Sequence, residues 1–248
     1  MAASIAIVSG NQATMIDVTP DVRQQYRLLM TEHQVLVSSI YLTHAHWGHY
    51  GGLPLFGKES LDTKGLPLFV TRGMSEYLSK NEPFTSLVRN QHFELSIVKA
   101  VAIDEVLKAG TMKAGRNISK MQKTVVAVPH RTSLTDTVAY VVDLNGRSVI
   151  YMPDIDALTD DLEDLVRRCD LAIIDGTFYS ADEIRTRDIS EVPHPLVSEL
   201  SERLKDISER IIFTHLNHTN PLVDPDSRQN IALTEMGFEI AQDGDVLV

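Results

Sequence analysis

Short apolar runs and amphipathic stretches alternate along most of this chain. Runs with the length and β-branched content of strands occur at residues 4–8, 14–18, 38–43, 68–71, 93–98, 100–103, 124–128, 137–143, 148–152, 170–174 and 211–214. Apolar side chains recur at helical spacing after Thr19, after Thr159, over residues 195–207 and over residues 227–236. Asn145-Gly146, between two apolar runs, is typical of a hairpin turn. This succession of strands and helices predicts an α/β fold.

Length and composition are those of an ordinary globular protein. The chain has 248 residues, of which 43% are hydrophobic and 23% charged. No linker or change of composition divides it, so we expect a single domain over residues 1–248. No apolar run approaches the roughly 18 residues of a membrane span, and the first residues lack the basic and apolar parts of a secretory signal. A single cysteine, Cys169, excludes an intrachain disulfide, and these features predict a cytoplasmic protein.

Charge is distributed unevenly along the sequence. The net charge of −11 results from +3 over residues 1–150 and −14 over residues 151–248. An acidic second half disfavours long polyanions, so we expect no nucleic acid as a partner. One basic segment, residues 108–123, contains no acid and is either a solvated loop or a flap that attracts a small anionic substrate.

Histidines gather directly after the predicted strand at residues 38–43. His44, His46 and His49 place three imidazoles within six residues, where a loop can direct several ring nitrogens at one metal ion. The alternative is a surface loop in which three histidines occur by chance. Against that alternative, metal-type residues also follow later strands, namely His130, Asp154, Asp175 and His215. Since ligand sites of α/β sheets lie beyond strand ends, the pattern predicts a metal site at one edge of the strand framework.

The segment Thr43–His49 resembles the His-x-His-x-Asp-His signature of the metallo-β-lactamase-fold superfamily. Within the superfamily, residues 213–221 are similar to a stretch near the end of the pyrroloquinoline-quinone biosynthesis protein B group, and the likeness extends over nearly the whole chain. The tRNA 3′-processing endonucleases (ribonuclease Z) and the cyclic phosphodiesterase of phosphonate breakdown are similar at a greater distance. The resemblance implies a four-layer αββα metallo-β-lactamase-type sandwich.

Three departures from the family pattern are visible. Gly48 occupies the position of the signature Asp, which removes a ligand of a second metal ion. The chain begins at what corresponds to the family's second strand, so we expect the first N-terminal strand to be missing. A sheet without that strand has a bare edge that a second copy of the chain would cover, as in a homodimer. His44 and His46 are often absent from the quinone-biosynthesis group, and in this respect the chain is closer to the hydrolases.

The resemblance also implies a role for each site residue. The expected ligands are His44, His46 and His130 for one metal ion, and His49 and His215 for a second ion, with Asp154 bridging both. Zn²⁺ is the expected metal, as one or two ions, and Mn²⁺ or Fe²⁺ suits the same ligands. In the endonuclease and phosphodiesterase relatives, a histidine before a helix acts as general acid and a carboxylate orients it. His194 and Asp175 match those catalytic positions.

Three functions stay open at this point. The first is a metal-dependent hydrolase that attacks a small phosphodiester or related ester with a metal-bound hydroxide. The second is a biosynthetic enzyme of quinone cofactor formation, redox-type, with iron at the same histidines. The third is a non-catalytic metal-binding protein on the same scaffold, which Gly48 favours. His194, Asp175 and the basic segment favour the hydrolase, with phosphodiesterase activity.

Overall fold

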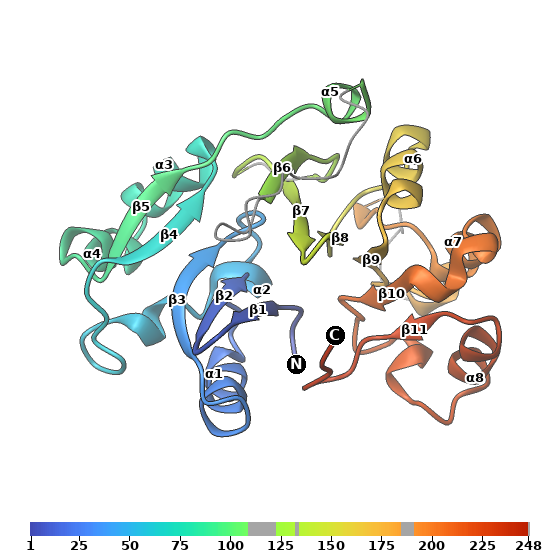
Figure 1. Ribbon diagram of the computed structural model, residues 1–248, viewed down its shortest axis with the longest axis horizontal. Coiled ribbons are helices and arrows are strands. Elements are labelled where there is room, and N and C mark those ends of the chain that lie inside the picture. The colour runs from blue at the N-terminus through green and yellow to red at the C-terminus, as the bar shows by residue number, and fades with distance from the viewer. Residues whose placement is uncertain (109–122, 132–133, 185–190, 248) are drawn as a thin grey trace. The chain divides into compact units, whose positions relative to one another are not determined.

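The chain folds into two compact units, each built on one β-sheet (Figure 1). The computed structural model describes residues 1–108, 123–131, 134–184 and 191–247. The first unit comprises Met1–Lys99, Thr132–Thr137 and Asp243–Val248, and the second comprises Ala100–Arg131 and Val138–Gln242. The expectation of a single domain stays a prediction.

A five-stranded sheet is the framework of the first unit. Its strands, in sheet order, are β1 (Ile5–Ser9), β2 (Gln12–Ile16), β3 (Leu36–Tyr41), β4 (Leu66–Val70) and β5 (Phe93–Ile97). Its helices are α1 (Val22–Thr31), α2 (Trp47–Tyr50), η1 (Leu53–Phe56), α3 (Arg72–Lys80) and α4 (Phe84–Arg89). β1 pairs antiparallel with β2, whereas β2, β3, β4 and β5 are parallel. Since Ile16 pairs with Tyr41, the residues that follow β2 and β3 leave from the same edge of the sheet.

A six-stranded mixed sheet is the framework of the second unit. Its strands, in sheet order, are β11 (Glu239–Ile240), β10 (Ile211–Thr214), β9 (Leu171–Asp175), β8 (Arg147–Met152), β7 (Val138–Leu144) and β6 (Lys123–Ala127). Its helices are α5 (Ile103–Lys108), α6 (Asp160–Arg168), η2 (Ala181–Glu183), α7 (Val197–Arg203), η4 (Lys205–Arg210), η5 (Pro221–Val223) and α8 (Arg228–Glu235). Strands β8 to β11 are parallel, and β6 and β7 complete an antiparallel meander with β8. The carboxyl ends of β6, β8, β9 and β10 therefore meet at one edge.

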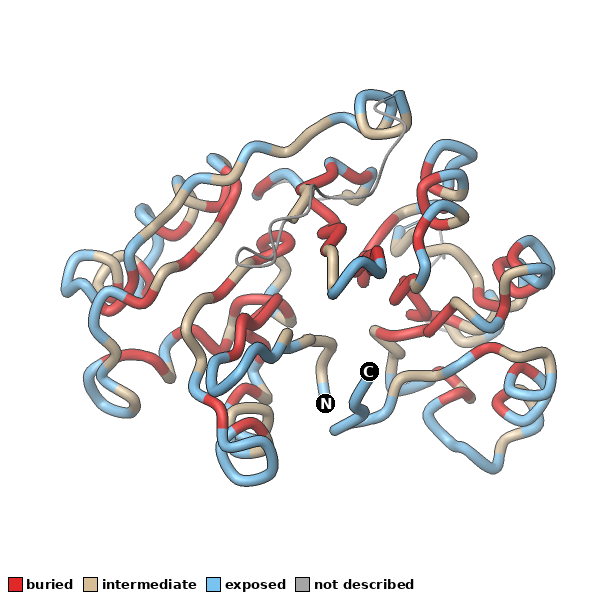
Figure 2. Tube along the Cα trace, in the orientation of Figure 1, coloured by how far each residue is buried: buried red, intermediate tan, exposed pale blue. Residues whose placement is uncertain are grey.

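Each unit has its own apolar core, and Figure 2 shows the buried segments concentrated along the strands. The first core includes Met15, Ile40 and Leu68 from three neighbouring strands, all at most 1% exposed. In the second unit, β8 and β9 are buried along nearly their whole length. Their continuous apolar runs, rather than alternating ones, follow from this burial.

Local signals in the sequence account for several boundaries. Asn145 and Gly146 both have positive φ angles, +57° and +88°, as the two-residue hairpin between β7 and β8 requires. Helix α6 begins where the Thr159 side chain accepts a hydrogen bond from Leu162 N, and it carries acids in its first turn and arginines in its last. These charges oppose the partial charges of the helix ends and stabilise α6.

Three expectations need comment. The strand predicted at residues 100–103 is wrong: only Val101 forms an isolated bridge, to Val126, and α5 begins at Ile103. The basic segment 108–123 lies, apart from its two ends, outside the described residues. In the described part of the chain, no helix combines the length and the apolar character needed to cross a membrane. A cytoplasmic location and a homodimer stay predictions.

Candidate metal centre

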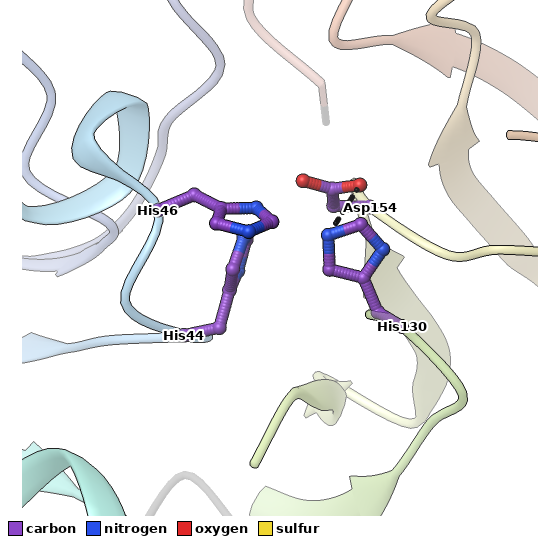
Figure 3. A group of neighbouring side chains, drawn as sticks. All are labelled: His44, His46, His130 and Asp154. Atoms are coloured by element: carbon purple, nitrogen blue, oxygen red, sulfur yellow. Dashed lines mark ion pairs between the residues drawn. The ribbon is translucent and has the colours of Figure 1, made fainter. Parts of the chain in front are cut away.

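Three histidines of the first unit lie together on the loop that follows β3. His44 and His49 are buried, with 0% and 2% of their surface exposed, whereas His46 is half-buried. The ring centroid of His44 lies 4.6 Å from that of His46 and 4.2 Å from that of His49. Figure 3 shows His44 and His46 arising from this one loop. A hydrogen bond of 3.1 Å from Ala45 N to Thr135 Oγ1 holds the loop.

A buried carboxylate that the sequence analysis did not identify orients two of these rings. Asp17 follows β2, is 0% exposed and has a φ of +67°, which Asp tolerates better than most residues. It accepts hydrogen bonds from Thr43 N at 2.8 Å, from Thr43 Oγ1 at 2.9 Å and from His49 Nδ1 at 2.8 Å. Because the single hydroxyl proton of Thr43 is donated to Asp17, the Thr43 oxygen accepts from His44 Nδ1 at 2.9 Å. Asp17 therefore holds His49 directly and His44 through Thr43.

The polar residues at the strand ends of the second unit converge on Asp154. His130 Nε2 lies 3.2 Å from Asp154 Oδ1, the ion pair drawn in Figure 3. His194 Nδ1 lies 3.4 Å from the same oxygen, and His215 Nε2 lies 3.8 Å from Oδ2. Donor atoms of Asp154, Asp175 and His194 all lie within 4.8 Å of one another. Asp154 is 3% exposed, so this cluster is a buried one.

Asp175 does in the second unit what Asp17 does in the first. Its Oδ2 accepts from His194 Nδ1 at 2.8 Å, and its Oδ1 accepts from Thr177 Oγ1 at 2.7 Å. The Thr177 oxygen in turn accepts from His215 Nδ1 at 2.8 Å. In each unit, one fully buried carboxylate thus orients one histidine directly and a second through a threonine.

In five of the histidines described above, the ring nitrogen Nδ1 is hydrogen-bonded to a protein oxygen. The partners are Thr43 for His44, Asp17 for His49, Asp156 for His130, Asp175 for His194 and Thr177 for His215. A neutral ring that donates from Nδ1 carries its lone pair on Nε2, the tautomer that a metal ligand needs. Neutral imidazoles with a carboxylate are a donor set that suits Zn²⁺, Mn²⁺ or Fe²⁺. The residues present therefore fit a divalent metal.

Sequence reasoning named the histidines and gave Asp175 as the carboxylate that orients His194, but it missed the orienting roles of Asp17, Asp156 and Thr177. Asp17 directly follows a strand, which is the same signal that identified Asp154 and Asp175. Asp156 and Thr177 each come two residues after an identified acid, where a turn residue is the ordinary expectation. Their roles follow only from contacts between segments far apart in the chain, such as the 32 residues between Asp17 and His49.

His194 combines the contacts of a proton donor with a neighbouring cavity. Burial lowers the pKa of His194, but the hydrogen bond and charge of Asp175 and the charge of Asp154 outweigh burial, so the net pKa is raised above its usual value. A cavity of about 350 Å³ adjoins the ring and is lined by, among others, Pro193, Leu196 and Arg203. A group that accepts a proton from His194 has space there.

Comparisons with known proteins show the family and the fold of this chain. A family described as "Beta-lactamase superfamily domain" matches residues 14–216. "Coenzyme PQQ synthesis protein B" of Cupriavidus taiwanensis is 26% identical over 266 residues, which cover 97% of this chain and 85% of that protein. The structure of Zn(2+)-bound PqqB from Methylobacterium extorquens superposes with a TM-score of 0.78 at 20% identity, covering 99% of this chain and 87% of that one. A diphosphatase from the PhnP family superposes with a TM-score of 0.61 at 19% identity, covering 98% and 82%. The predicted fold class, α/β with two sheets and flanking helices, is confirmed.

Proposed function

Since this chain belongs to the β-lactamase superfamily domain family, we propose that it is a metal-dependent hydrolase acting on a small phosphodiester or a related ester. The observation that carries the proposal is the orientation of the histidines: five Nδ1 atoms are engaged by protein oxygens. Four of these five rings, those of His44, His49, His130 and His215, belong to proposed ligands, and a purely structural cluster has no need to fix the tautomer of so many rings. A metal centre does, because only one ring nitrogen of each histidine coordinates.

In this proposal the ligands are those that the family resemblance implies. His44, His46, His130 and Asp154 would hold one ion, and His49, Asp154 and His215 would hold a second. Because Gly48 contributes no side chain, the second ion would be held more weakly than the first. A divalent ion in this donor set would lower the pKa of water and stabilise negative charge on a phosphoryl oxygen.

The protein itself supplies the proton for the leaving group. His194 is kept in one tautomer by Asp175, and its raised pKa extends the protonated form to higher pH. With Nδ1 donated to Asp175, Nε2 is the nitrogen that gives its proton to the departing oxygen. The adjoining cavity of about 350 Å³ then accommodates the departing group. The structural neighbour named as a diphosphatase supports hydrolysis at phosphorus as the class of reaction.

A second candidate is a metal-dependent biosynthetic role, with iron at the same histidines. It is favoured by the likeness to "Coenzyme PQQ synthesis protein B", which extends over 97% of this chain. The ligand types do not separate the two functions, since imidazoles and a carboxylate suit Fe²⁺ as well as Zn²⁺. Bound zinc or manganese together with hydrolysis of an ester would support the first function. Bound iron together with consumption of oxygen would support the second.

Hydrolysis of two aromatic diesters by the metal-loaded protein tests the first function. We expect turnover of bis(p-nitrophenyl) phosphate, and loss of both turnover and metal in His44→Ala. The exposed His33→Ala serves as the matched control. His194→Gln should keep its metal and lose about 10²–10⁴-fold in turnover of diphenyl phosphate. The loss should be smaller for the nitrophenyl ester, because nitrophenolate departs without a proton. Equal losses on both esters would contradict the role of His194, and an inactive, metal-loaded wild type would contradict the function.

A further inference from the structure

One large apolar side chain of the histidine loop is exposed to solvent. Trp47 is 58% exposed, although its neighbours Ala45, His49 and Tyr50 are at most 5% exposed. It is also the single tryptophan of the chain. Trp47 begins helix α2 and directly follows His46, so its Cα lies about 3.8 Å from that of a proposed metal ligand.

The indole of Trp47 packs against two neighbouring residues despite its exposure. Its centroid lies 5.7 Å from the ring of Tyr50, at an interplanar angle of 79°. Tyr50 is itself fixed by a hydrogen bond of 2.7 Å between its hydroxyl and that of Tyr77, and by contact with Phe84 at 5.0 Å between centroids. These contacts make an edge-to-face arrangement that orients the indole.

A glycine provides the space in which the indole lies. A Cβ atom at Gly51 would be 2.7 Å from Cε2 and 2.9 Å from Cδ2 of Trp47, closer than carbon atoms approach without displacement. The indole therefore packs directly on the backbone of Gly51. An exposed side chain with no role usually samples several rotamers and gains nothing from such support. Here the aromatic edge of Tyr50 and the bare backbone of Gly51 support a flat apolar surface on the residue that directly follows His46.

We propose that Trp47 is a stacking platform for a planar aromatic ring of the substrate, a ring carried on the same molecule as the phosphorus ester. The inference rests on the proposed function, because only a phosphoryl group held at the histidines brings an attached ring to Trp47. Stacking covers indole surface that is otherwise in contact with water, and it tolerates any flat ring. The substrate class is thereby narrowed to aryl or nucleoside phosphodiesters. Trp47 binds the ring and takes no part in bond cleavage.

Fluorescence of the single tryptophan reports on this contact without any turnover. In zinc-loaded protein excited at 295 nm, adenosine 5′-monophosphate should quench and shift the emission, whereas ribose 5-phosphate, which lacks the planar base, should not. In Gly51→Ala the tryptophan remains, but the added methyl group, 2.7 Å from both Cε2 and the backbone oxygen of Trp47, displaces the indole and the backbone beside it. We expect an altered emission spectrum and weaker quenching in that variant. Equal effects of the two ligands on the wild type would overturn the proposal.

Kinetics with two esters distinguish failure of the stacking role proposed for Trp47 from failure of the proposed hydrolase function. Both bis(p-nitrophenyl) phosphate and methyl p-nitrophenyl phosphate release nitrophenolate, but only the first carries a second ring. Trp47→Ala should raise KM about tenfold for the first ester, with little change in kcat or metal content. The kinetics of the second ester should change little, because its one ring is the leaving group, which the proposed function places beside His194. Trp47→Phe should restore most of the loss. If the wild type hydrolyses both esters and Trp47→Ala has no effect, the stacking role of Trp47 is rejected and the hydrolase function stands. No hydrolysis of either ester by the wild type would reject the hydrolase, and the fluorescence titration would still decide on the platform.

Discussion

Replacing Asp17 by asparagine separates the orientation of a metal ligand from the stability of the fold. Asparagine has nearly the same shape as aspartate and tolerates the positive φ of +67° at this position. The Oδ1 atom of Asp17 accepts from Thr43 N at 2.8 Å, so the amide oxygen of the new side chain should keep that place. The amide NH₂ group would then replace Oδ2, which now accepts from His49 Nδ1 at 2.8 Å and from Thr43 Oγ1 at 2.9 Å.

In the Asp17→Asn variant, two donors would face each other at the contact with His49. The favourable response is a change of tautomer, in which Nδ1 of His49 accepts from the amide and Nε2 carries the proton. Loss of charge-assisted hydrogen bonds should cost about 1–2 kcal/mol of unfolding free energy. A protonated Nε2 cannot bind a metal, so the affinity for the ion held by His49 should fall by about 10–100-fold.

Three measurements on the Asp17→Asn variant check these consequences. Titration against chelator buffers, followed by mass spectrometry of bound metal, gives the affinity for each ion. Two-dimensional ¹⁵N spectra of the imidazoles identify the tautomer of His49. If Asp17 had only a structural role, the substitution would leave that tautomer unchanged. Urea unfolding gives the stability. Asp62→Asn is the matched control, since Asp62 also has a positive φ, of +45°, but lies in an exposed turn. Unchanged metal affinity together with a proton still on Nδ1 of His49 would refute the reasoning.

Further predictions concern two glycines and the cysteine. Gly48→Asp should tighten binding of the second metal ion, because a carboxylate adds a ligand and a Cβ atom at residue 48 meets nothing within 4 Å. Equilibrium dialysis showing no gain over Gly48→Ala would contradict this prediction. Gly52→Ala should destabilise the protein by about 3 kcal/mol in urea unfolding, since its Cβ would lie 2.0 Å from the Thr19 carbonyl oxygen. Burial, together with the charge of Asp170, raises the pKa of the Cys169 thiol to about 12, so native protein should not react with Ellman's reagent at pH 8 until it is unfolded. Because the folded thiol has the higher pKa, stability should fall as the pH rises from 9 toward 12, and Cys169→Ala should lose less over that range.

Much of the local structure and the identity of the metal-type residues could be predicted from the sequence. Hydrophobic periodicity indicated most strands and helices, since burial of one face imposes a period on each element. The hairpin at Asn145-Gly146 followed from the positive φ angles that those residues adopt readily. The strand predicted at residues 100–103 is wrong because a short apolar run forms a strand only if another strand lies beside it. Within this run Val101 alone is paired, in an isolated bridge.

The pairing of each histidine with its orienting oxygen was decided by tertiary structure. Strand ends made Asp154, Asp175 and His215 candidates, because a strand that ends at a sheet edge exposes the next side chain there. Nothing in the local sequence connects Asp17 with His49, or assigns Thr177 to His215 across 38 residues. Parallel pairing of β2 with β3, and of β9 with β10, brings those residues into contact, and the register of a sheet is a property of the folded chain. Composition and periodicity thus determined which side chains are available for metal chemistry, whereas strand register determined which ring nitrogen each of them offers.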